Sequence, residues 1–153
     1  PVIAAGGIAD GRGIVAAFAL GAEGVQVGTR FVCCSECNAH NRYKEEILAA
    51  GDRSTVTTGR RTGHPVRCLK NKLTQEFEKL EEKQASVEEF EALGAGRLRK
   101  AVVEGDVDWG SVMAGQIAGL VREVKPAAEI IRDMFETARQ VSEKLSVDLK
   151  FGR

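Results

Sequence analysis

The chain has 153 residues, a length that suits one domain, and 43% of them are hydrophobic, which is enough for a buried core. Basic and acidic side chains balance at 22 each, so we expect no nucleic-acid partner and no acidic tail. No apolar run reaches the length of a membrane span, so no membrane association is expected. Three of the four cysteines crowd into residues 33–37, which favours free thiols and a reducing, cytoplasmic compartment.

The first residues predict a strand–helix–strand unit. Val2 to Ala5 is a short apolar run ending at Gly6-Gly7, typical of a strand buried on both faces of a parallel sheet. Asp10 is expected to cap a helix that ends at Gly21. Gly24 to Gly28 then forms a second strand, and the helix between the strands makes the crossover that parallel strands require.

The middle of the chain predicts helices separated by a polar loop. We expect one helix over residues 35–50 and an irregular loop over residues 52–65. Apolar residues from Val66 to Leu80 recur at spacings of three and four, which predicts a long amphipathic helix. Ser86 and Glu89 have the spacing of a capping box at the start of a shorter helix.

The last third of the chain also predicts helices. A helix is expected over residues 97–104, followed by a turn at residues 105–108. Ser111 is a candidate cap for a further helix, and Pro126 suits the first turn of the last one. The tail after Ser146 is expected to fray.

These elements amount to two parallel strands plus about six helices. Two strands do not make a stable sheet of their own, so the sheet must be completed by residues outside this chain. The chain also starts at Pro1, directly before a core strand, where a natural domain rarely begins. We therefore expect a piece of a longer polypeptide whose N-terminal half is missing.

The two strands end in glycine turns that can bind a phosphate. Gly6 and Gly7 follow the first strand, and Gly28 and Thr29 follow the second. Both turns are expected at the same edge of the parallel sheet, where glycine lets backbone amides approach an oxyanion closely. Such cradles are common after the last strands of (β/α)8 barrels. The alternative is that these glycines only make tight turns.

The segment that contains these turns, PVIAAGGIADGRGIVAAFALGAEGVQVGTRF, resembles the flavin-phosphate segment of the flavin-dependent enoyl-acyl-carrier-protein reductases and of the nitronate monooxygenases. Inosine-monophosphate dehydrogenases share a looser version. The motifs GHPVRCLKN at residues 63–71 and GSVMAGQIAG at residues 110–119 are similar to segments of the first two families. NAH at residues 38–40, GAG at 94–96 and the GDVD turn resemble the enoyl reductases most.

The resemblance implies an α/β fold, the C-terminal part of an FMN-binding (β/α)8 TIM barrel. Residues 1–34 would be its last two βα units, residues 35–109 a helical insertion, and residues 110–153 the closing helices. It also implies that the backbone at the two glycine turns holds the flavin phosphate and that two further side chains lie near the cofactor. The implied cofactor-binding residues are Gly6, Gly7, Gly28, Thr29, Met113 and Gln116.

Other polar residues have weaker assignments. The resemblance makes His64, Arg67 and Asn71 candidates to shape or brace the substrate side. From the residues alone, His64 also reads as an exposed loop histidine and Arg67 as half of a surface ion pair. The general acid proposed for the enoyl reductases is a histidine upstream of this chain, so no catalytic residue is assigned here.

Cys34, Cys37 and His40 have a spacing that zinc ligands can adopt. The enoyl reductases have no metal cluster at this place, however, and we expect no metal. We interpret the thiols as partly buried and incidental.

The resemblance implies an oxidoreductase that uses FMN and either NADH or NADPH to reduce a 2-enoyl thioester on acyl carrier protein, in fatty-acid biosynthesis, as a homo-oligomer. The first alternative is a nitronate monooxygenase that uses FMN and oxygen. The second is an inactive truncated half-barrel that only binds phosphate or a partner chain. A whole barrel needs about 250 residues, so the isolated chain is expected to be inactive.

Overall fold

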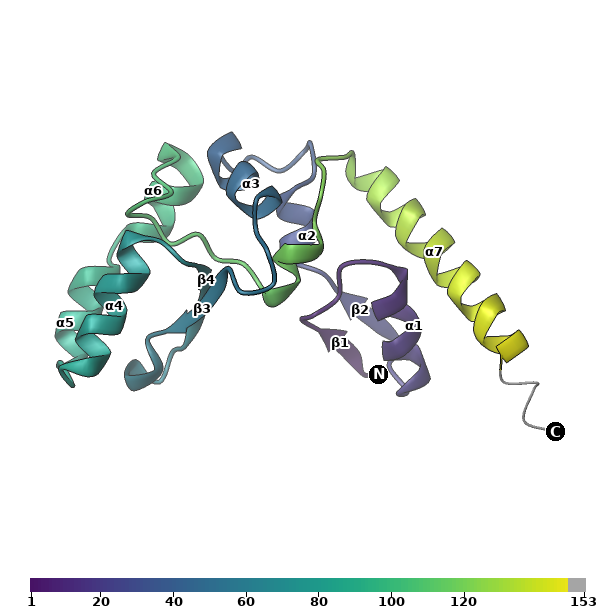
Figure 1. Cartoon of the computed structure of the whole chain (residues 1–153), viewed down its shortest axis with the longest axis horizontal. Helices are drawn as coiled ribbons and strands as arrows, with labels where there is room; N and C mark the ends of the chain where they lie inside the picture. The colour runs from purple at the N-terminus through teal and green to yellow at the C-terminus, as the bar shows by residue number, and fades with distance from the viewer. Residues whose placement is uncertain (149–153) are drawn as a thin grey trace.

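The front of the protein is a parallel strand–helix–strand crossover (Figure 1). A computed structural model describes residues 1–148, in which β1 (Ile3–Ala5) pairs in parallel with β2 (Gly24–Gln26). Between them, α1 (Gly11–Ala19) is capped by the Asp10 carboxylate, which accepts a hydrogen bond of 2.9 Å from an amide of the first turn. Gly21 follows the helix at φ +92°, the left-handed conformation expected there. The predicted crossover is confirmed.

The expectation that the first strand is buried on both faces is wrong. Val2 and Ile3 are 65% and 54% exposed. Within residues 1–148, β1 has a hydrogen-bonded neighbour only in β2, so its other edge is open. An apolar strand with an open edge is a surface that favours pairing with further chain.

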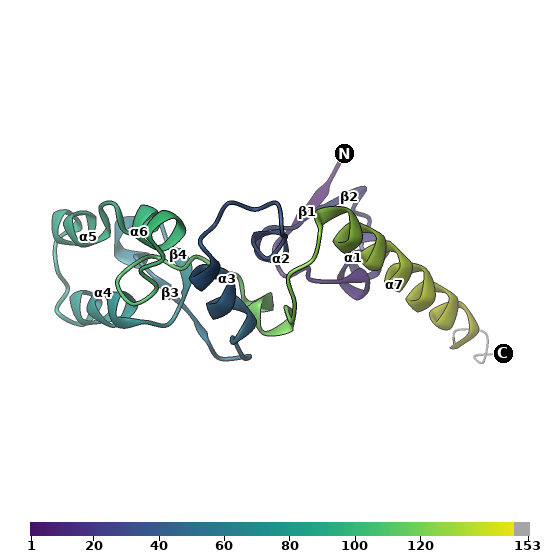
Figure 2. The same ribbon diagram turned by 90° about the horizontal axis from the view of Figure 1, so that it is seen from above.

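The last helix covers the crossover. α7 (Ala127–Asp148) packs along α1, and the two lie side by side in Figures 1 and 2. Ile14 of α1 and Ile130 of α7 are almost fully buried in this contact. The predicted final helix is confirmed. It continues past Ser146 to Asp148, and the rest of the predicted frayed tail lies outside the described residues.

The single helix predicted over residues 35–50 is wrong. The structure has a short α2 (Thr29–Val32), irregular chain over residues 33–40, and then α3 (Asn41–Leu48). The buried Lys44 side chain holds the irregular chain, because its ammonium donates to the carbonyls of Cys34 at 2.8 Å and Cys37 at 2.7 Å. A side chain thus satisfies carbonyls that a helix would have bonded itself.

An antiparallel hairpin replaces the predicted polar loop and the start of the long helix. β3 (Thr55–Thr58) pairs with β4 (Val66–Leu69), and η1 (Arg60–Thr62) lies in the connection. Gly59 and Gly63 flank η1 at φ +72° and +75°, which lets the chain reverse. All four residues of β3 are β-branched, which suits a sheet. The helix predicted from Val66 therefore begins only at α4 (Lys72–Glu82).

Two helices complete the end of the molecule that holds the hairpin. α5 (Val87–Gly94) begins at the predicted capping box, in which Ser86 and Glu89 each bond the other's backbone amide. α6 (Arg97–Glu104) follows, and its predicted helix is confirmed. Figure 2 places α4, α5 and α6 together beside the hairpin, at the opposite end from α7.

The helix expected after Ser111 is wrong. Residues 112–115 are extended, and they bond β4 through Leu69 N to Val112 O at 2.8 Å and Ala114 N to Arg67 O at 3.1 Å. This segment forms an isolated antiparallel bridge to the hairpin, between Met113 and Cys68, since the backbone finds its partners there. Only the short η2 (Gln116–Leu120) is helical before α7.

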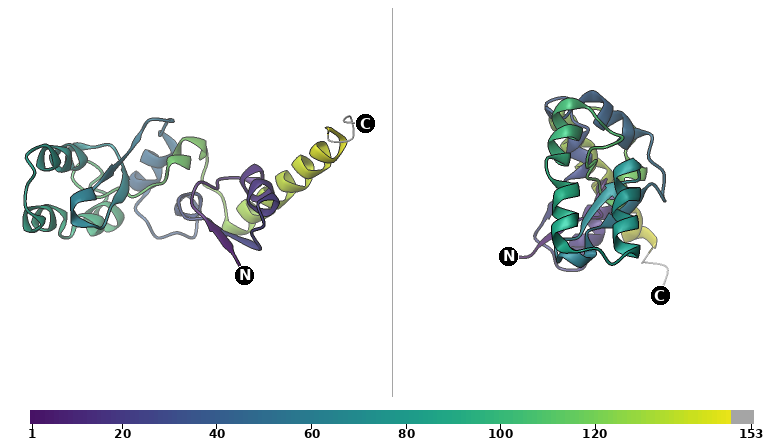
Figure 3. Two further views of the ribbon diagram at one scale, coloured as in Figure 1. Left: turned by 90° about the horizontal axis from the view of Figure 1, so that it is seen from below. Right: turned by 90° about the vertical axis from the view of Figure 1, so that its left-hand side faces the viewer.

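The molecule is elongated (Figure 3). Residues 1–148 form two apolar cores. One lies between α1, the strand pair and α7; the other lies between α3, η2 and the hairpin side of the molecule. Segment 111–115 and α2 connect the two regions. No helix in residues 1–148 combines the length and the apolar character that crossing a membrane requires.

Candidate functional site

The glycine turns at the ends of β1 and β2 form an open cradle. Gly6 and Gly7 lie at φ +86° and +74°, conformations that favour glycine over any other residue. A Cβ built at Gly6, Gly7 or Gly28 would meet nothing within 4 Å. Packing therefore does not demand glycine at these three positions. The open space in front of them is what a bound anionic group would fill, so the residues present fit a phosphate.

Thr29 lies at the same edge and is fixed in place. Its hydroxyl oxygen accepts a hydrogen bond of 2.9 Å from the amide of Gly115. The hydroxyl hydrogen stays available to donate, as expected for a residue that helps to hold an anion. Gln116, next along the chain, is exposed at the start of η2.

The first turn of α1 carries its own negative charge. The Asp10 carboxylate bonds the Arg12 guanidinium at 2.7 Å, and this contact lowers the pKa of Asp10. The carboxylate is therefore ionised at neutral pH and occupies an amide of this helix end. A phosphate at this edge would be held by the glycine backbone in preference to the first turn of α1.

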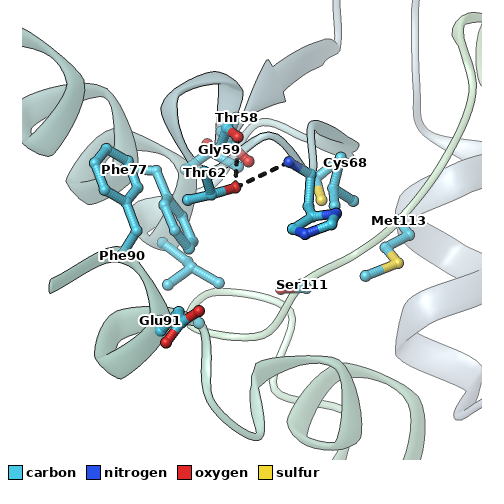
Figure 4. Close-up of a pocket in the computed structure, with 14 residues that line it drawn as sticks. Thr58, Gly59, Thr62, Cys68, Phe77, Phe90, Glu91, Ser111 and Met113 are labelled. Atoms are coloured by element: carbon cyan, nitrogen blue, oxygen red, sulfur yellow. Dashed lines mark hydrogen bonds between the residues drawn. The ribbon is translucent and has the colours of Figure 1, made fainter. Parts of the chain in front are cut away.

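A second feature is a cavity of about 230 Å³ between the hairpin, α4 and α5 (Figure 4). Phe77 and Phe90 stack at one end with ring centroids 6.0 Å apart, and Met113 lies at the other. Between these ends, Val66 and Cys68 of β4 contribute apolar wall. The cavity is thus a mostly apolar space that runs between two helices and segment 111–115.

Segment 111–115 joins the cavity to the glycine turns. Met113 lines the cavity, and Gly115, two residues further on, donates to Thr29. The Tyr43 hydroxyl donates to the Met113 carbonyl at 2.7 Å, and burial raises the pKa of this phenol. The Met113 end of the cavity therefore points toward the cradle through a short, braced segment.

The structure separates the three residues predicted for the substrate side. His64 is exposed and lines the cavity. Arg67 points to the opposite face of the hairpin, where its guanidinium donates to Thr55 at 3.2 Å. In the described residues the Arg67 guanidinium forms this hydrogen bond with a hydroxyl, and its role on the substrate side stays a prediction.

Asn71 braces the fold below the cavity. Its amide nitrogen donates to the carbonyls of Val107 at 2.7 Å and Gly110 at 2.8 Å, while its amide oxygen caps α4. One side chain thus joins the hairpin end, α4 and the turn that leads into segment 111–115. These contacts give Asn71 a structural role, and its part on the substrate side stays a prediction.

Several cavity residues were missing from the sequence-based candidates. Phe77 was expected as the core face of a helix, and Phe90 was expected on a capped helix, but nothing in their spacing paired them. Thr58 and Cys68 lie on strands that the sequence pattern did not reveal. Arg67 between Val66 and Cys68 is the only hint of apolar and polar alternation in β4, and the apolar Leu69 breaks it.

The Cys68 thiol is inert at neutral pH. It is buried, and burial raises its pKa to about 11, well above the usual range for cysteine. At pH 8 a thiol reagent is therefore expected to modify the half-buried Cys37 readily and to leave Cys68 unmodified. Peptide mapping by mass spectrometry checks the order. Rapid modification of Cys68 at pH 8 in the folded protein would contradict the burial of Cys68 in the wall of the cavity.

All four cysteines are free, and His40 uses its ring to cap α3 by accepting from the Arg42 amide at 3.2 Å. Within the described part of the chain, no group of three or more His, Cys, Asp and Glu side chains is arranged to hold a metal ion. The structure gives the three residues other contacts, since His40 caps α3 and the carbonyls of Cys34 and Cys37 accept from Lys44.

A parallel crossover that ends in glycine turns, with a helix-covered insertion beside it, defines part of an α/β-barrel enzyme. The chain belongs to the nitronate monooxygenase family, whose family model matches residues 1–137. Members of this family and its structural neighbours are oxidoreductases.

Curated relatives support the same family. The probable nitronate monooxygenase of Bacillus subtilis is 39% identical over 125 residues, which cover 81% of this chain and 36% of the relative. The nitronate monooxygenase of Pseudomonas aeruginosa is 38% identical over 144 residues, 91% of this chain and 40% of the relative. The chain thus spans about two fifths of the length of these relatives.

Solved structures match the chain closely. FabK from Thermotoga maritima superposes with a TM-score of 0.91 and 50% identity, covering 95% of this chain and 46% of that one. A nitroalkane oxidase from Streptomyces ansochromogenes superposes with a TM-score of 0.75 and 29% identity, covering 95% of this chain and 41% of that one. The predicted resemblance and barrel-derived fold are confirmed.

Proposed function

We propose that this chain is the flavin-phosphate-binding part of an FMN-dependent oxidoreductase that reduces 2-enoyl thioesters carried by acyl carrier protein, with NADH or NADPH as electron donor. The observation that carries the proposal is the 50% identity to FabK, an enoyl-acyl-carrier-protein reductase, against 29% to the nitroalkane oxidase at the same 95% coverage. The activity belongs to the whole protein, and we expect further chain to complete the barrel along the open edge of β1.

The residues of this chain have binding and positioning roles in the proposal. The backbone at Gly6, Gly7 and Gly28, with the Thr29 hydroxyl, holds the FMN phosphate. Met113 presents an apolar side chain where a ring or a substrate can pack, and Gln116 lies near the cofactor. FMN, when bound, supplies the hydride chemistry. The proton donor is proposed to come from outside this chain.

The second candidate function is oxidation of nitronates by FMN and oxygen. The family model and the curated relatives carry that name, which specifically favours it. Activity assays on the intact protein distinguish enoyl reduction from nitronate oxidation. Oxidation of NADH or NADPH that depends on a 2-enoyl thioester supports the reductase, whereas oxygen uptake that depends on a nitroalkane or its nitronate, with no enoyl activity, overturns it.

Two glycine-to-alanine variants, one in the proposed phosphate cradle and one outside it, test the flavin site. Gly7→Ala and Gly96→Ala each place a Cβ at nearly the same left-handed backbone, φ +74° and +71°, with nothing within 4 Å. Each is expected to lose about 1–2 kcal/mol of stability from that backbone alone. Only Gly7→Ala puts the methyl in the proposed phosphate cradle. We expect its FMN affinity to fall about tenfold to a hundredfold, the effect of losing one charge-assisted hydrogen bond.

Flavin fluorescence on titration of the apoprotein measures both affinities. Equal FMN affinity in the Gly7→Ala and Gly96→Ala variants would remove the cradle from the proposal. The isolated 153-residue chain is expected to be inactive even where it binds FMN, because it contributes two of the barrel's parallel strands.

A further inference from the structure

The cavity beside the hairpin has the chemistry of a hydrocarbon site. Its walls include the faces of Phe77 and Phe90 and the side chains of Leu73 and Val66. Cys68 adds a neutral thiol, since burial keeps its pKa near 11. A ligand in this space meets apolar surface along most of its length.

The Thr62 hydroxyl at the rim already has its hydrogen-bond partners within the protein. The Thr62 hydroxyl donates to the Gly59 carbonyl at 2.8 Å and accepts from the His64 amide at 3.2 Å, as the dashed lines in Figure 4 show. The exposed carboxylate of Glu91 also lines the cavity, so a ligand with its own terminal carboxylate is disfavoured. The cavity therefore favours an uncharged aliphatic chain over a polar ligand.

The shape and size of the cavity suit a chain of medium length. The cavity extends from the Phe77 and Phe90 rings to Met113 (Figure 4), and the Met113 end points toward the glycine turns through Gly115. Its volume is about 230 Å³. An elongated space of this volume accommodates several methylene groups, each about the size of a water molecule.

We propose that this cavity binds the acyl chain of the thioester substrate, with the end of the chain against Phe77 and Phe90 and the thioester end at Met113, and that its size sets the preferred chain length. This inference rests on the proposed enoyl reduction, whose substrate is an acyl chain on a thioester. It assigns substrate selection to the hairpin, α4 and α5, elements that lie apart from the glycine turns.

Replacing Val66 by a larger or a smaller residue tests whether the cavity sets the preferred chain length. Its side chain lines the cavity from β4, on the same face of the hairpin as Thr58. In the intact protein, Val66→Phe should lower kcat/KM for an eight-carbon enoyl thioester relative to a four-carbon one, by about fourfold for each methylene excluded. Val66→Ala should shift the preference toward longer chains. Loss of folding cannot produce opposite shifts in two variants.

Thr57→Phe is the matched control, because Thr57 pairs with Arg67 on the face of the hairpin away from the cavity. It should leave the chain-length ratio unchanged. An unchanged ratio in both Val66 variants, in a protein that reduces both thioesters, overturns the acyl-chain site while the proposed function stands.

A binding measurement distinguishes failure of the proposed enoyl reduction from failure of the acyl-chain site. Octanoyl coenzyme A is a saturated thioester that cannot be reduced, and calorimetry measures its affinity directly. If no enoyl thioester is reduced but octanoyl coenzyme A binds and Val66→Phe weakens it at least fourfold, the proposed function fails and the acyl site stands. If octanoyl coenzyme A binds equally to the parent and the Val66→Phe variant, the acyl site fails.

Discussion

Asn71→Asp is expected to destabilise the protein by about 3 kcal/mol, although aspartate caps helices as well as asparagine does. The Asn71 amide nitrogen donates to two carbonyls, those of Val107 and Gly110, at 2.7 and 2.8 Å. A carboxylate has no hydrogen to donate, so both carbonyls would lose their partner and face a like charge. Each unsatisfied carbonyl costs about 1–3 kcal/mol.

The size of the loss relative to Asn71→Ala identifies its cause. If capping α4 were the whole role of Asn71, the aspartate would preserve stability and the alanine would cost about 1 kcal/mol. If the bracing of the two carbonyls dominates, the aspartate is at least as damaging as the alanine. Denaturant unfolding of the intact protein gives both values, and a parent-like Asn71→Asp variant would refute the bracing role.

Gly11→Ala is expected to cost about 1–3 kcal/mol or more, the range for overpacking a tight contact. A Cβ at Gly11 would overlap the backbone nitrogen of Ala138 and the carbonyl of Met134, both in α7. Backbone atoms cannot rotate away as a side chain can, so α7 must move off α1. Replacing glycine by alanine inside a helix usually raises the stability of the protein by about 0.5–1 kcal/mol. The loss expected at Gly11 is therefore opposite in sign to the usual effect.

Gly13→Ala is the control, two residues further along the same helix. Its Cβ would meet the Ile8 side chain at 3.1 Å, a neighbour that can shift by a few tenths of an ångström. We expect a much smaller change in melting temperature than for Gly11→Ala. Similar losses in the two variants would mean that the contact with α7 does not set the effect.

Local signals predicted the parts of the fold that local contacts decide. The Asp10 cap, the Ser86–Glu89 capping box and the left-handed Gly21 are each determined by neighbouring backbone groups, and all three were predicted. The parallel crossover followed from apolar runs that end in glycine. The same runs located the glycine turns, which remain the predicted cofactor site.

Elements that depend on distant partners were missed. Val66 and Leu69 fit a helical spacing equally well, and only pairing with β3 makes them a strand. Residues 112–115 are extended because β4 is beside them, a partner more than forty positions away in the sequence. The irregular chain before α3 is set by the Lys44 ammonium. The cavity beside the hairpin could not be predicted, because the hairpin, α4 and α5 enclose it together.

The close contact between α1 and α7 also constrains the order in which the protein can fold during synthesis. Gly11 and Ala138 are separated by 127 positions (138 − 11), so this core closes only after the whole insertion has been made. At ribosomal rates of about 5–20 residues per second, the apolar face of α1 is synthesised roughly 6–25 seconds before the part of α7 that covers it. Ile14 and Ala17 remain uncovered by α7 throughout that interval. The apolar face of α1 is therefore open to aggregation until α7 emerges.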